Sequence, residues 1–231
     1  MLDEPLGLTV HSLPRPQDAV QDAGRRTRSG RLKMLAVLVV CAAPVIASYF
    51  TYYVIRPEGR RNYGELIEPQ RPLPAITAQS LQGEPRPLRS LRGQWLLVSV
   101  AGGACDAGCE KHLYLQRQLR EGLGKDKERV DWVWLVVDQA PVRESLLPAL
   151  AQATVLRVDR AQLGQWLEPG QGGQLADHLY LVDPVGNWMM RFPAAQTLEL
   201  DTAQAKNIKR DLERVLRASA SWDLPGRPGA P

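Results

Sequence analysis

Residues 95–109 read WLLVSVAGGACDAGC, and this stretch decides the fold. Its first seven residues form an apolar run of strand length, as expected for a strand whose two faces are both covered. Gly102 and Gly103 end the strand. From Cys105 to about Leu123 the chain is rich in Leu, Gln, Arg, Glu and Lys, which are good helix formers. The sequence therefore predicts a buried strand that leads directly into a helix.

The residues after this stretch alternate between strand and helix patterns. Runs of β-branched, aromatic and other apolar residues predict strands at 130–137, 154–158, 178–182 and 187–192. Helices are expected at 142–152, 160–167 and 202–218, and the last of these carries its apolar residues on one face. Residues 73–91 are expected to form an edge hairpin. This order predicts an α/β fold, a mixed sheet with helices on both faces.

An N-terminal segment has the length and composition of a membrane-spanning helix. Residues 34–55 form a run of 22 residues without Asp, Glu, Lys, Arg or His. At about 1.5 Å per residue, such a helix is about 33 Å long and crosses a hydrocarbon core of about 30 Å. Aromatic residues cluster at its C-terminal end, where they favour the membrane–water boundary. We therefore expect one transmembrane helix that holds the protein in a lipid bilayer.

The charges that flank this segment predict its orientation. Five basic residues closely precede it and three follow it, namely Arg25, Arg26, Arg28, Arg31 and Lys33 before, and Arg56, Arg60 and Arg61 after. Because cytoplasmic flanks carry the excess of Lys and Arg, we expect a bacterial inner-membrane protein with a cytoplasmic N-terminus and a periplasmic C-terminal domain. A cleaved signal peptide is the alternative, since Val45-Ile46-Ala47 has the spacing of a signal-peptidase site. The apolar run continues past Ala47, so we favour a permanent anchor.

Composition divides the chain into five parts. Residues 1–33 lack apolar periodicity and are expected to be a mobile cytoplasmic tail ahead of the membrane helix at 34–55. Residues 56–72 contain three prolines and are interpreted as a linker. The folded domain is expected over residues 73–218, and residues 219–231 as a flexible tail.

The distribution of charge argues against nucleic acid as a partner. The net charge is +4, from 29 Lys and Arg against 25 Asp and Glu. Residues 1–33 contribute six basic and four acidic residues, and residues 56–231 contribute 23 and 21, so each part carries only +2. Neither part has the basic block that a nucleic-acid groove needs, so we expect no nucleic acid partner.

Cys105 and Cys109 stand four residues apart where the predicted strand gives way to the predicted helix. This spacing places both side chains on the same side of a helix. Unpaired N–H groups and the helix dipole at an N-terminus stabilise thiolates, which bind metals or exchange disulfides. A static disulfide would close only a very small loop and stabilise little, so a chemical role is favoured. Two thiolates with an imidazole suit Cu(I), and the same pair could instead form a reversible disulfide.

At these residues the chain resembles a known family. The membrane anchor, the C-x3-C pair after the strand at 95–101, and the stretch DHLYLVDPVG at 177–186 resemble the Sco (SenC) family of copper chaperones. The resemblance extends over about residues 73–217. It implies a thioredoxin-like fold and a role in assembling the copper centre of cytochrome c oxidase.

The resemblance also implies site residues, a cofactor and partners. In that family two motif cysteines and a distal histidine bind copper, and by residue matching these roles fall on Cys105, Cys109 and His178. The expected cofactor is therefore copper, as Cu(I) or Cu(II). The expected partners are the copper-bearing subunit of cytochrome c oxidase or other assembly factors.

His112 is a second candidate for the third ligand. It follows Cys109 by three residues, so a helix can place both on one face. Its charged neighbours Glu110 and Lys111 favour a surface histidine instead. Cys41 lies within the apolar segment and is expected to pack in the membrane rather than bind a metal.

Three functions follow as hypotheses. The first is a membrane-anchored copper chaperone or thiol-redox factor in oxidase assembly, in which Cys105 and Cys109 bind copper or keep a partner's copper-binding cysteines reduced. Such a protein is a metallochaperone rather than a turnover enzyme. The second is a membrane-anchored thiol–disulfide oxidoreductase with the same two residues as catalytic cysteines. The third is a non-catalytic assembly scaffold.

Overall fold

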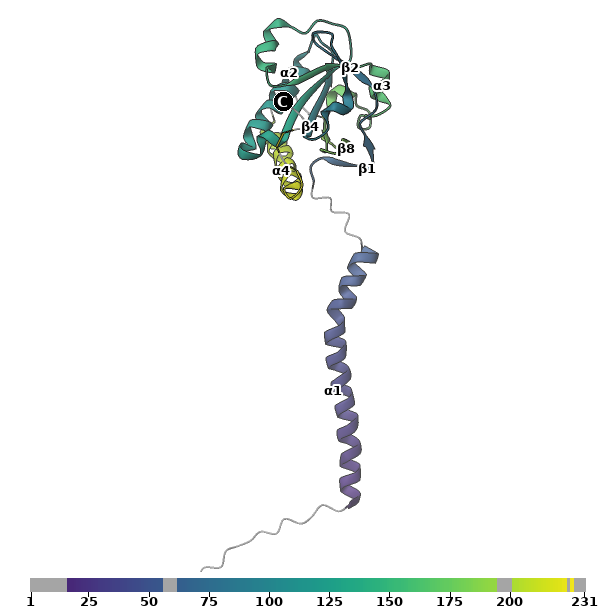
Figure 1. The fold of residues 1–231 in the computed structure, drawn as a ribbon. Coiled ribbons are helices and arrows are strands. Elements are labelled where there is room, and N and C mark those ends of the chain that lie inside the picture. Colours follow the sequence, from purple (N-terminus) through teal and green to yellow (C-terminus); the bar gives the residue numbers. More distant parts are fainter. Residues whose placement is uncertain (1–15, 56–61, 195–200, 224, 227–231) are drawn as a thin grey trace, which may run out of the picture. The chain divides into compact units, whose positions relative to one another are not determined.

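The computed structural model describes residues 16–55, 62–194, 201–223 and 225–226 (Figure 1). The chain divides into two compact units, Met1–Gly59 and Arg60–Pro231. The first unit contains the apolar segment, and the second contains both cysteines of the C-x3-C pair.

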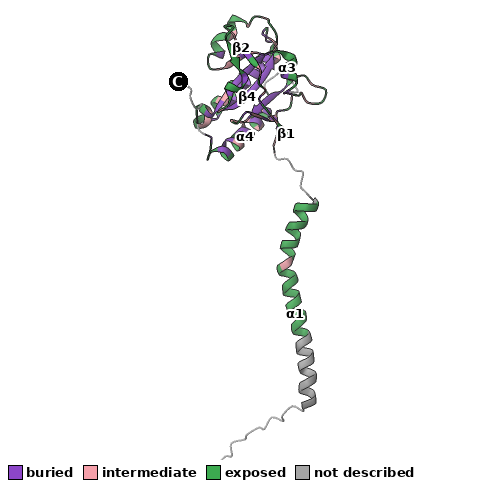
Figure 2. Cartoon of the chain, turned by 45° about the vertical axis from the view of Figure 1, so that its right-hand side comes forward, coloured by how far each residue is buried: buried purple, intermediate pink, exposed green. Residues whose placement is uncertain are grey.

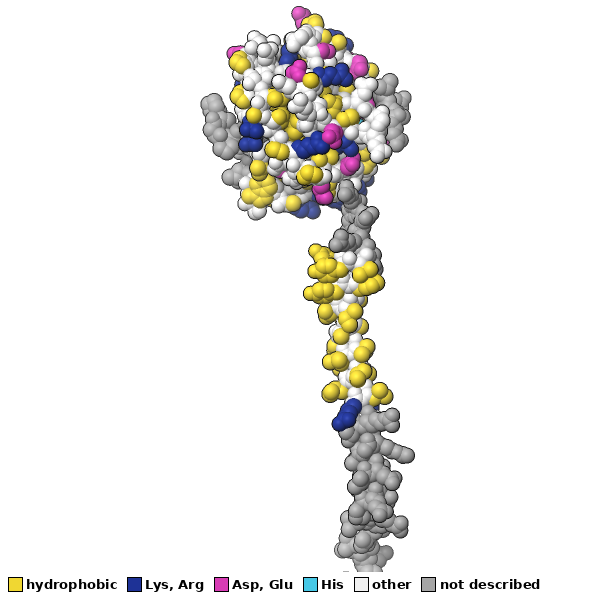
Figure 3. Space-filling model, turned by 90° about the vertical axis from the view of Figure 1, so that its right-hand side faces the viewer, with side chains coloured by type: hydrophobic (Ala, Val, Ile, Leu, Met, Phe, Trp, Pro, Cys, Tyr) yellow, Lys and Arg dark blue, Asp and Glu magenta, His cyan; other side chains and the backbone are white. Residues whose placement is uncertain are grey.

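The N-terminal unit is built on a long helix, α1 (Pro16–Phe50), which ends in a π-helical turn, Thr51–Ile55. Among the described residues, one helical segment, Ser29–Val54, is long and apolar enough to cross a membrane. The apolar part of this segment is not buried within the protein. Figure 2 shows this part of α1 exposed, and Figure 3 shows the hydrophobic side chains around it. The segment expected at 34–55 therefore has the length and apolar surface of a membrane span.

The helix begins earlier than the sequence predicts. Residues 1–33 are expected to be a tail without regular structure, but α1 already starts at Pro16. Proline suits the first position of a helix, because its φ is already helical and its missing N–H is not needed there. The expected tail is therefore helical from Pro16 onward, and residues 1–15 lie outside the described residues.

The C-terminal unit is an eight-stranded mixed sheet in the order β1-β8-β7-β4-β5-β6-β2-β3. β4 is parallel to β5 and antiparallel to β7, and β5 is parallel to β6. The strands are β1 (Glu65–Pro72), β2 (Thr77–Ser80), β3 (Pro85–Pro87), β4 (Trp95–Ala101), β5 (Val130–Val136), β6 (Thr154–Arg157), β7 (Leu179–Val182) and β8 (Asn187–Arg191). This arrangement confirms the predicted mixed sheet, including the edge hairpin formed by β2 and β3.

Helices cover both faces of the sheet. They are α2 (Ala107–Gly122), α3 (Arg160–Gly164) and α4 (Thr202–Ser219), with 3-10 turns η2 (Leu88–Leu91), η3 (Gly124–Arg129), η4 (Glu144–Leu150) and η5 (Leu175–Asp177). All seven residues of β4 are buried, as Figure 2 shows. Alternate β4 side chains point to opposite faces. Leu97 packs with α2 and α4, whereas Leu96 and Val98 pack with η2 and α3.

Two expected elements differ from the structure. Residues 65–72, expected to be part of the linker, form β1, which pairs antiparallel with β8 at the edge of the sheet. Pro69 and Pro72 are compatible with this place, because an edge strand does not need every N–H for pairing. The helix expected at 142–152 is the 3-10 turn η4, and Pro148 lies inside it, where a proline interrupts regular helical hydrogen bonding.

The first described residues of the domain are hydrogen-bonded to α4. The backbone N–H groups of Tyr63 and Gly64 both donate to Oδ2 of Asp211, at 2.6 and 2.9 Å. Asp211 is almost fully buried in the middle of α4, and its other carboxylate oxygen accepts from Arg214 at 3.3 Å. The point where the domain begins is therefore attached directly to this helix.

A buried ion pair attaches the residues after α4 to the sheet. Asp223, in the region expected to be a flexible tail, is buried and accepts from Arg129 at 2.8 Å and from the indole N–H of Trp95 at 2.7 Å. Arg129 also donates to the carbonyl oxygen of Leu216 in α4. The tail prediction is therefore wrong as far as Asp223.

Replacing Asp223 is expected to destabilise the domain strongly. Asp223→Ala leaves the Arg129 guanidinium buried without its main partner, and breaking a buried pair in this way costs about 3–5 kcal/mol. Asp126→Ala removes the more exposed partner of Arg129 and should cost at most about 1 kcal/mol. Urea unfolding of the two variants measures the difference. Equal losses would contradict a structural role for the tail.

Candidate functional site

The two motif cysteines form a disulfide at the junction of β4 and α2. Their Cα atoms lie 5.1 Å apart, with Cys105 in the connecting loop and Cys109 in the first turn of α2. Asp106 caps the helix, because its Oδ1 accepts the N–H of Cys109 at 2.9 Å. Cys105 therefore precedes the helix that the sequence predicts to begin at this residue.

The loop before Cys105 depends on a close approach between two chain segments. The N–H of Gly103 donates to Oδ1 of Asp138, just after β5, at 2.8 Å. A Cβ atom at Gly102 would overlap Asp138, and one at Gly103 would overlap the carbonyl oxygen of Ala140. This contact explains why two glycines follow β4.

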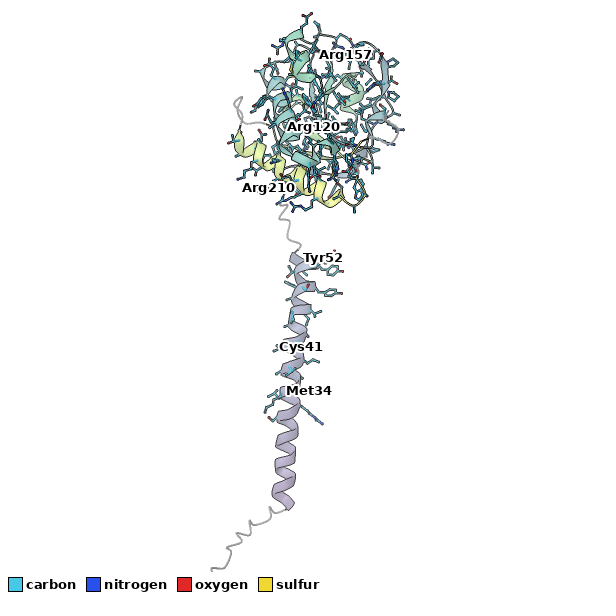
Figure 4. The ribbon with its side chains drawn as sticks, turned by 60° about the vertical axis from the view of Figure 1, so that its left-hand side comes forward. Met34, Cys41, Tyr52, Arg120, Arg157 and Arg210 are labelled. Carbon is cyan, nitrogen blue, oxygen red and sulfur yellow. A yellow bond between two sulfur atoms is a disulfide. The ribbon has the colours of Figure 1, made fainter. Side chains whose placement is uncertain are left out.

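Arg157 of β6 holds the segment after β5, against which this loop packs. Its guanidinium donates to the carbonyl oxygens of Asp138 and Ala140, at 2.7 and 2.9 Å (Figure 4). Cys105 itself has a φ of +47°, a left-handed conformation that is uncommon for residues other than glycine. Its N–H donates to the carbonyl oxygen of Gly102 at 3.1 Å. The surrounding contacts hold a backbone geometry that the residue would not adopt unaided.

The disulfide is covered by the segment after β5. Cys105 and Cys109 are only 3% and 5% exposed, in a cluster with apolar side chains of α2, β5 and η4. Arg143 donates to the carbonyl oxygen of Cys105 at 2.7 Å and pairs with Glu110 of α2. Val142 packs against the same cluster. A partner thiol must displace part of this cover to reach the sulfur atoms.

A pocket of about 200 Å³ opens beside the covered disulfide. Its lining comes from α2, β5 and η4 and consists of Glu110, Leu113, Tyr114, Arg117, Trp132, Leu146, Ala149 and Leu150. Leu113, Trp132 and Leu150 belong to the cluster that contains the two cysteines. Tyr114 and Leu147 are among the large apolar side chains that the domain exposes. The pocket therefore shares three of its lining residues with the cluster that contains the disulfide.

Both ring nitrogens of His178 form hydrogen bonds with backbone groups. The residue precedes β7 and is 5% exposed. Nδ1 lies 2.9 Å from the carbonyl oxygen of Phe192, and Nε2 accepts the N–H of Gly170 at 3.0 Å. These partners fix the tautomer with the hydrogen on Nδ1. No nitrogen lone pair of His178 is left for a metal in this structure.

His112 is buried, so its interpretation as a surface residue is wrong. It is 7% exposed, and its neighbour Lys111, which suggested a solvated face, is also buried. Burial, the largest cause, and the charge of Lys111 together lower the pKa of His112 to about 4, whereas Asp177 opposes the shift. A backbone hydrogen bond to Ala176 places His112 beside η5, close to His178. The sequence does not reveal that η5 covers this part of α2.

The expected copper ligands do not form a metal site in this structure. The two sulfur atoms are bonded to each other, and His178 is engaged by Gly170 and Phe192. Within the described residues, no group of three or more His, Cys, Asp or Glu side chains is placed to hold a metal ion. The arrangement holds a disulfide that a partner thiol reaches only when part of its cover is displaced.

Comparison with known proteins places this architecture in a family. Residues 95–219 match the family described as "Transmembrane-like, thioredoxin-like, C-terminal domain". The chain belongs to this family. No curated protein matches this sequence.

Solved structures share the fold of this transmembrane-like, thioredoxin-like protein at low sequence identity. Apo Sco1 from Thermus thermophilus is 19% identical, with a TM-score of 0.50 over 69% of this chain and 99% of that one. A putative protein disulfide isomerase from Bacteroides thetaiotaomicron is 14% identical, with a TM-score of 0.48 over 69% and 97%. Copper-bound ScoI from Bradyrhizobium japonicum is 19% identical, with a TM-score of 0.40 over 58% and 96%. The predicted thioredoxin-like fold is confirmed, and the resemblance to Sco proteins holds at the level of the fold.

Acid is expected to weaken the domain through His112. Its pKa of about 4 in the folded state lies below the 6.5 of a free histidine, so the unfolded chain binds the proton first. The contribution of neutral His112 to the free energy of unfolding is complete above pH 6.5. It is lost as the pH falls towards 4, by about 3 kcal/mol in total. Urea unfolding at both ends of this range should show a smaller decrease for His112→Gln than for the wild type. The same decrease in both proteins would contradict this assignment.

Loss of Arg143 is expected to uncover the disulfide. Arg143→Gln removes the bond to Cys105 and the ion pair with Glu110, so excess dithiothreitol should reduce the disulfide several-fold faster. Stability should change by less than about 1 kcal/mol, because the ion pair is partly exposed. Alkylation followed by mass spectrometry gives the rate, with Arg86→Gln on β3 as the surface control. An unchanged rate would show that Arg143 does not limit access.

Proposed function

We propose that this protein is a membrane-anchored thiol-redox factor that acts on the cysteines of a partner outside the cytoplasm. The observation that carries the proposal is the Cys105–Cys109 disulfide at the β4–α2 junction of a thioredoxin-like fold. A bonded pair next to a helix N-terminus is chemically competent for exchange, because that end of the helix stabilises a released thiolate. The apolar helix α1 supports a permanent attachment to the bilayer.

The proposed reaction reduces a disulfide of the partner. With the pair in its dithiol form, one thiolate attacks a partner sulfur, forms a mixed disulfide and releases the other partner sulfur as a thiolate. The second cysteine of the pair then displaces the partner, which leaves with two thiols, while Cys105 and Cys109 become bonded. Two electrons pass to the partner, and a dithiol protein outside the cytoplasm must supply them again. The bonded state in this structure corresponds to the product of that reaction.

The pocket beside the disulfide supports a protein rather than a small thiol as the substrate. Its apolar lining gives a partner chain a surface to contact next to its reacting cysteine. A partner chain that contacts Leu146 or Tyr114 would lie beside the segment after β5 that covers the disulfide and that Arg143 links to Cys105. Binding and displacement of the cover would then occur together.

The sequence resemblance to the Sco family suggests which partner to test. We propose the copper-bearing subunit of cytochrome c oxidase, or another factor in its assembly, with its copper-binding cysteines as the substrate. We also propose that the domain faces the periplasm of a bacterial inner membrane, as the flanking charges predict.

A copper chaperone is the second candidate function. Reduction would free two sulfur atoms next to a helix N-terminus, and His112 and His178 lie close to each other nearby. For His178 to serve as a ligand, its Nε2 must leave the N–H of Gly170. Cu(I) titration of the reduced protein, with His178→Ala and His112→Ala as variants, separates this function from exchange alone.

Disulfide exchange by the full-length protein in detergent tests the proposal. Reduced wild type should transfer electrons to a peptide disulfide, and Cys105→Ser and Cys109→Ser should each abolish turnover, because neither alone can complete the second displacement. The matched control is Cys41→Ser, which removes the other cysteine and should leave the rate unchanged. A wild-type protein that exchanges no faster than Cys105→Ser would overturn the proposal. A copper stoichiometry that depends on His178 would then favour the chaperone.

A further inference from the structure

The outer face of α4 carries a basic stripe. Lys206, Arg210 and Arg217 are all exposed, and their spacing places them on one side of the helix, opposite its buried apolar residues. Figure 4 shows Arg210 on the outer side of α4. None of the three forms an ion pair with any residue that the structure describes. Their side chains therefore face solvent, and Glu213 is the acidic residue on the same side of the helix.

The residues around this stripe add to its positive charge. α4 contains five basic and two acidic residues. Of the acidic ones, Asp211 is buried, and Glu213 is paired with Lys209 at 3.5 Å. Lys125 of η3 lines a hollow together with Arg217, and Asp126 and Glu213 line it too. An anionic surface would complement this face.

An exposed tryptophan follows the stripe. Trp222 is 56% exposed and lies just beyond the last turn of α4. Its N–H bonds back to the carbonyl oxygen of Ser219, so the residue belongs to the ordered end of the helix. Trp222 follows Arg217 by five residues, and an exposed tryptophan is typical of surfaces at the membrane–water boundary, because one part of its ring is apolar and the other polar.

The chain that joins the two units restricts how far α4 can be from the bilayer. Only residues 56–62 separate Ile55, at the end of the apolar helix, from Tyr63, which is bonded to Asp211 of α4. At about 3.5 Å per residue, this connection reaches at most about 28 Å even when fully extended. α4 is itself about 27 Å long. A connection of this length is compatible with contact between α4 and the bilayer.

We propose that this face, namely Lys206, Arg210 and Arg217 with Trp222, docks on anionic phospholipid headgroups of the bilayer that α1 crosses. The proposal rests on the proposed membrane anchoring but not on the thiol chemistry. Basic side chains near an anionic leaflet gain electrostatic attraction that falls off within a Debye length. The short connection keeps the face at a high local concentration over that leaflet.

Docking in this way leaves the end of α2 that carries Cys109 free for a partner. The side chain of Lys209 in α4 lies next to Gly122, at the C-terminal end of α2. Cys109 is in the first turn of α2, about 20 Å further along the helix. The membrane would therefore hold the domain by one end of α2 and present the other end to a partner.

Fluorescence quenching of the full-length protein in vesicles tests the proposal. Nitroxide-labelled headgroups quench nearby indoles, and the difference between wild type and Trp222→Phe isolates the signal of Trp222. Quenching of Trp222 should be at least about twofold stronger in vesicles with one phosphatidylglycerol in three lipids than in pure phosphatidylcholine, and high salt should remove the excess. Arg210→Glu/Arg217→Glu should lose the excess, whereas Arg86→Glu/Arg160→Glu, with the same change of charge elsewhere, should keep it.

Two further measurements separate the possible failures. Flotation with pure phosphatidylcholine vesicles reports the α1 anchor alone, and disulfide exchange on the same samples reports the thiol chemistry. Equal quenching of Trp222 in both lipids by a protein that floats would overturn the proposal. Equal quenching in both lipids together with capture of an acidic soluble protein would also overturn it and assign the face to a protein partner.

Discussion

The close approach of the β4–α2 loop to the segment after β5 is the contact on which the candidate site depends. β4 and β5 are parallel, so their C-terminal ends lie side by side, and the two glycines after β4 let the chains touch without a side chain between them. Asp138 accepts the N–H of Gly103 in the loop, and Arg157 donates to the carbonyl oxygen of Asp138 and so holds the segment against which the loop packs. The unusual backbone of Cys105, the cap at Asp106 and the position of the disulfide all follow from this contact.

The site combines a reactive bond with restricted access. A disulfide that is almost fully buried is shielded from small reductants, and its surroundings combine side chains of β4, β5 and α2 with the segment after β5. The contact between Arg143 and the carbonyl oxygen of Cys105 is made by a side chain that is itself partly exposed, so it can be broken without unfolding the domain. Selectivity for a protein partner can therefore arise from the cover, without any change in the chemistry of the sulfur atoms.

Much of the fold can be predicted from the sequence because its central strands are continuous apolar runs. The bounds of β4 agree with the prediction, and β5 and α2 differ from it only at their ends. The pairing of Cys105 with Cys109 was one of two chemical outcomes that their spacing predicts. Strand β1 was missed because prolines at 69 and 72 suggest a linker, and only pairing with β8 makes the segment a strand.

The histidines were harder to predict because distant backbone groups decide their roles. Gly170 and Phe192 occupy the ring of His178, and η5 buries His112, although neither contact has a signature near the histidine itself. Likewise, Asp223 is ordered by Arg129, which lies far from it in the sequence. Side-chain environment of this kind depends on tertiary packing, which local patterns do not encode.

The two outermost strands have a consequence for a protein confined to the plane of a bilayer. Neighbouring copies in such a plane meet edge to edge far more often than copies in free solution, and an unprotected sheet edge would let them polymerise. β1 contains Pro69 and Pro72, and β3 begins and ends with Pro85 and Pro87, so both rims of the sheet lack N–H donors that a neighbouring chain would need. The prolines that suggest a linker at β1, like those of β3, therefore disfavour pairing of these edges with another copy.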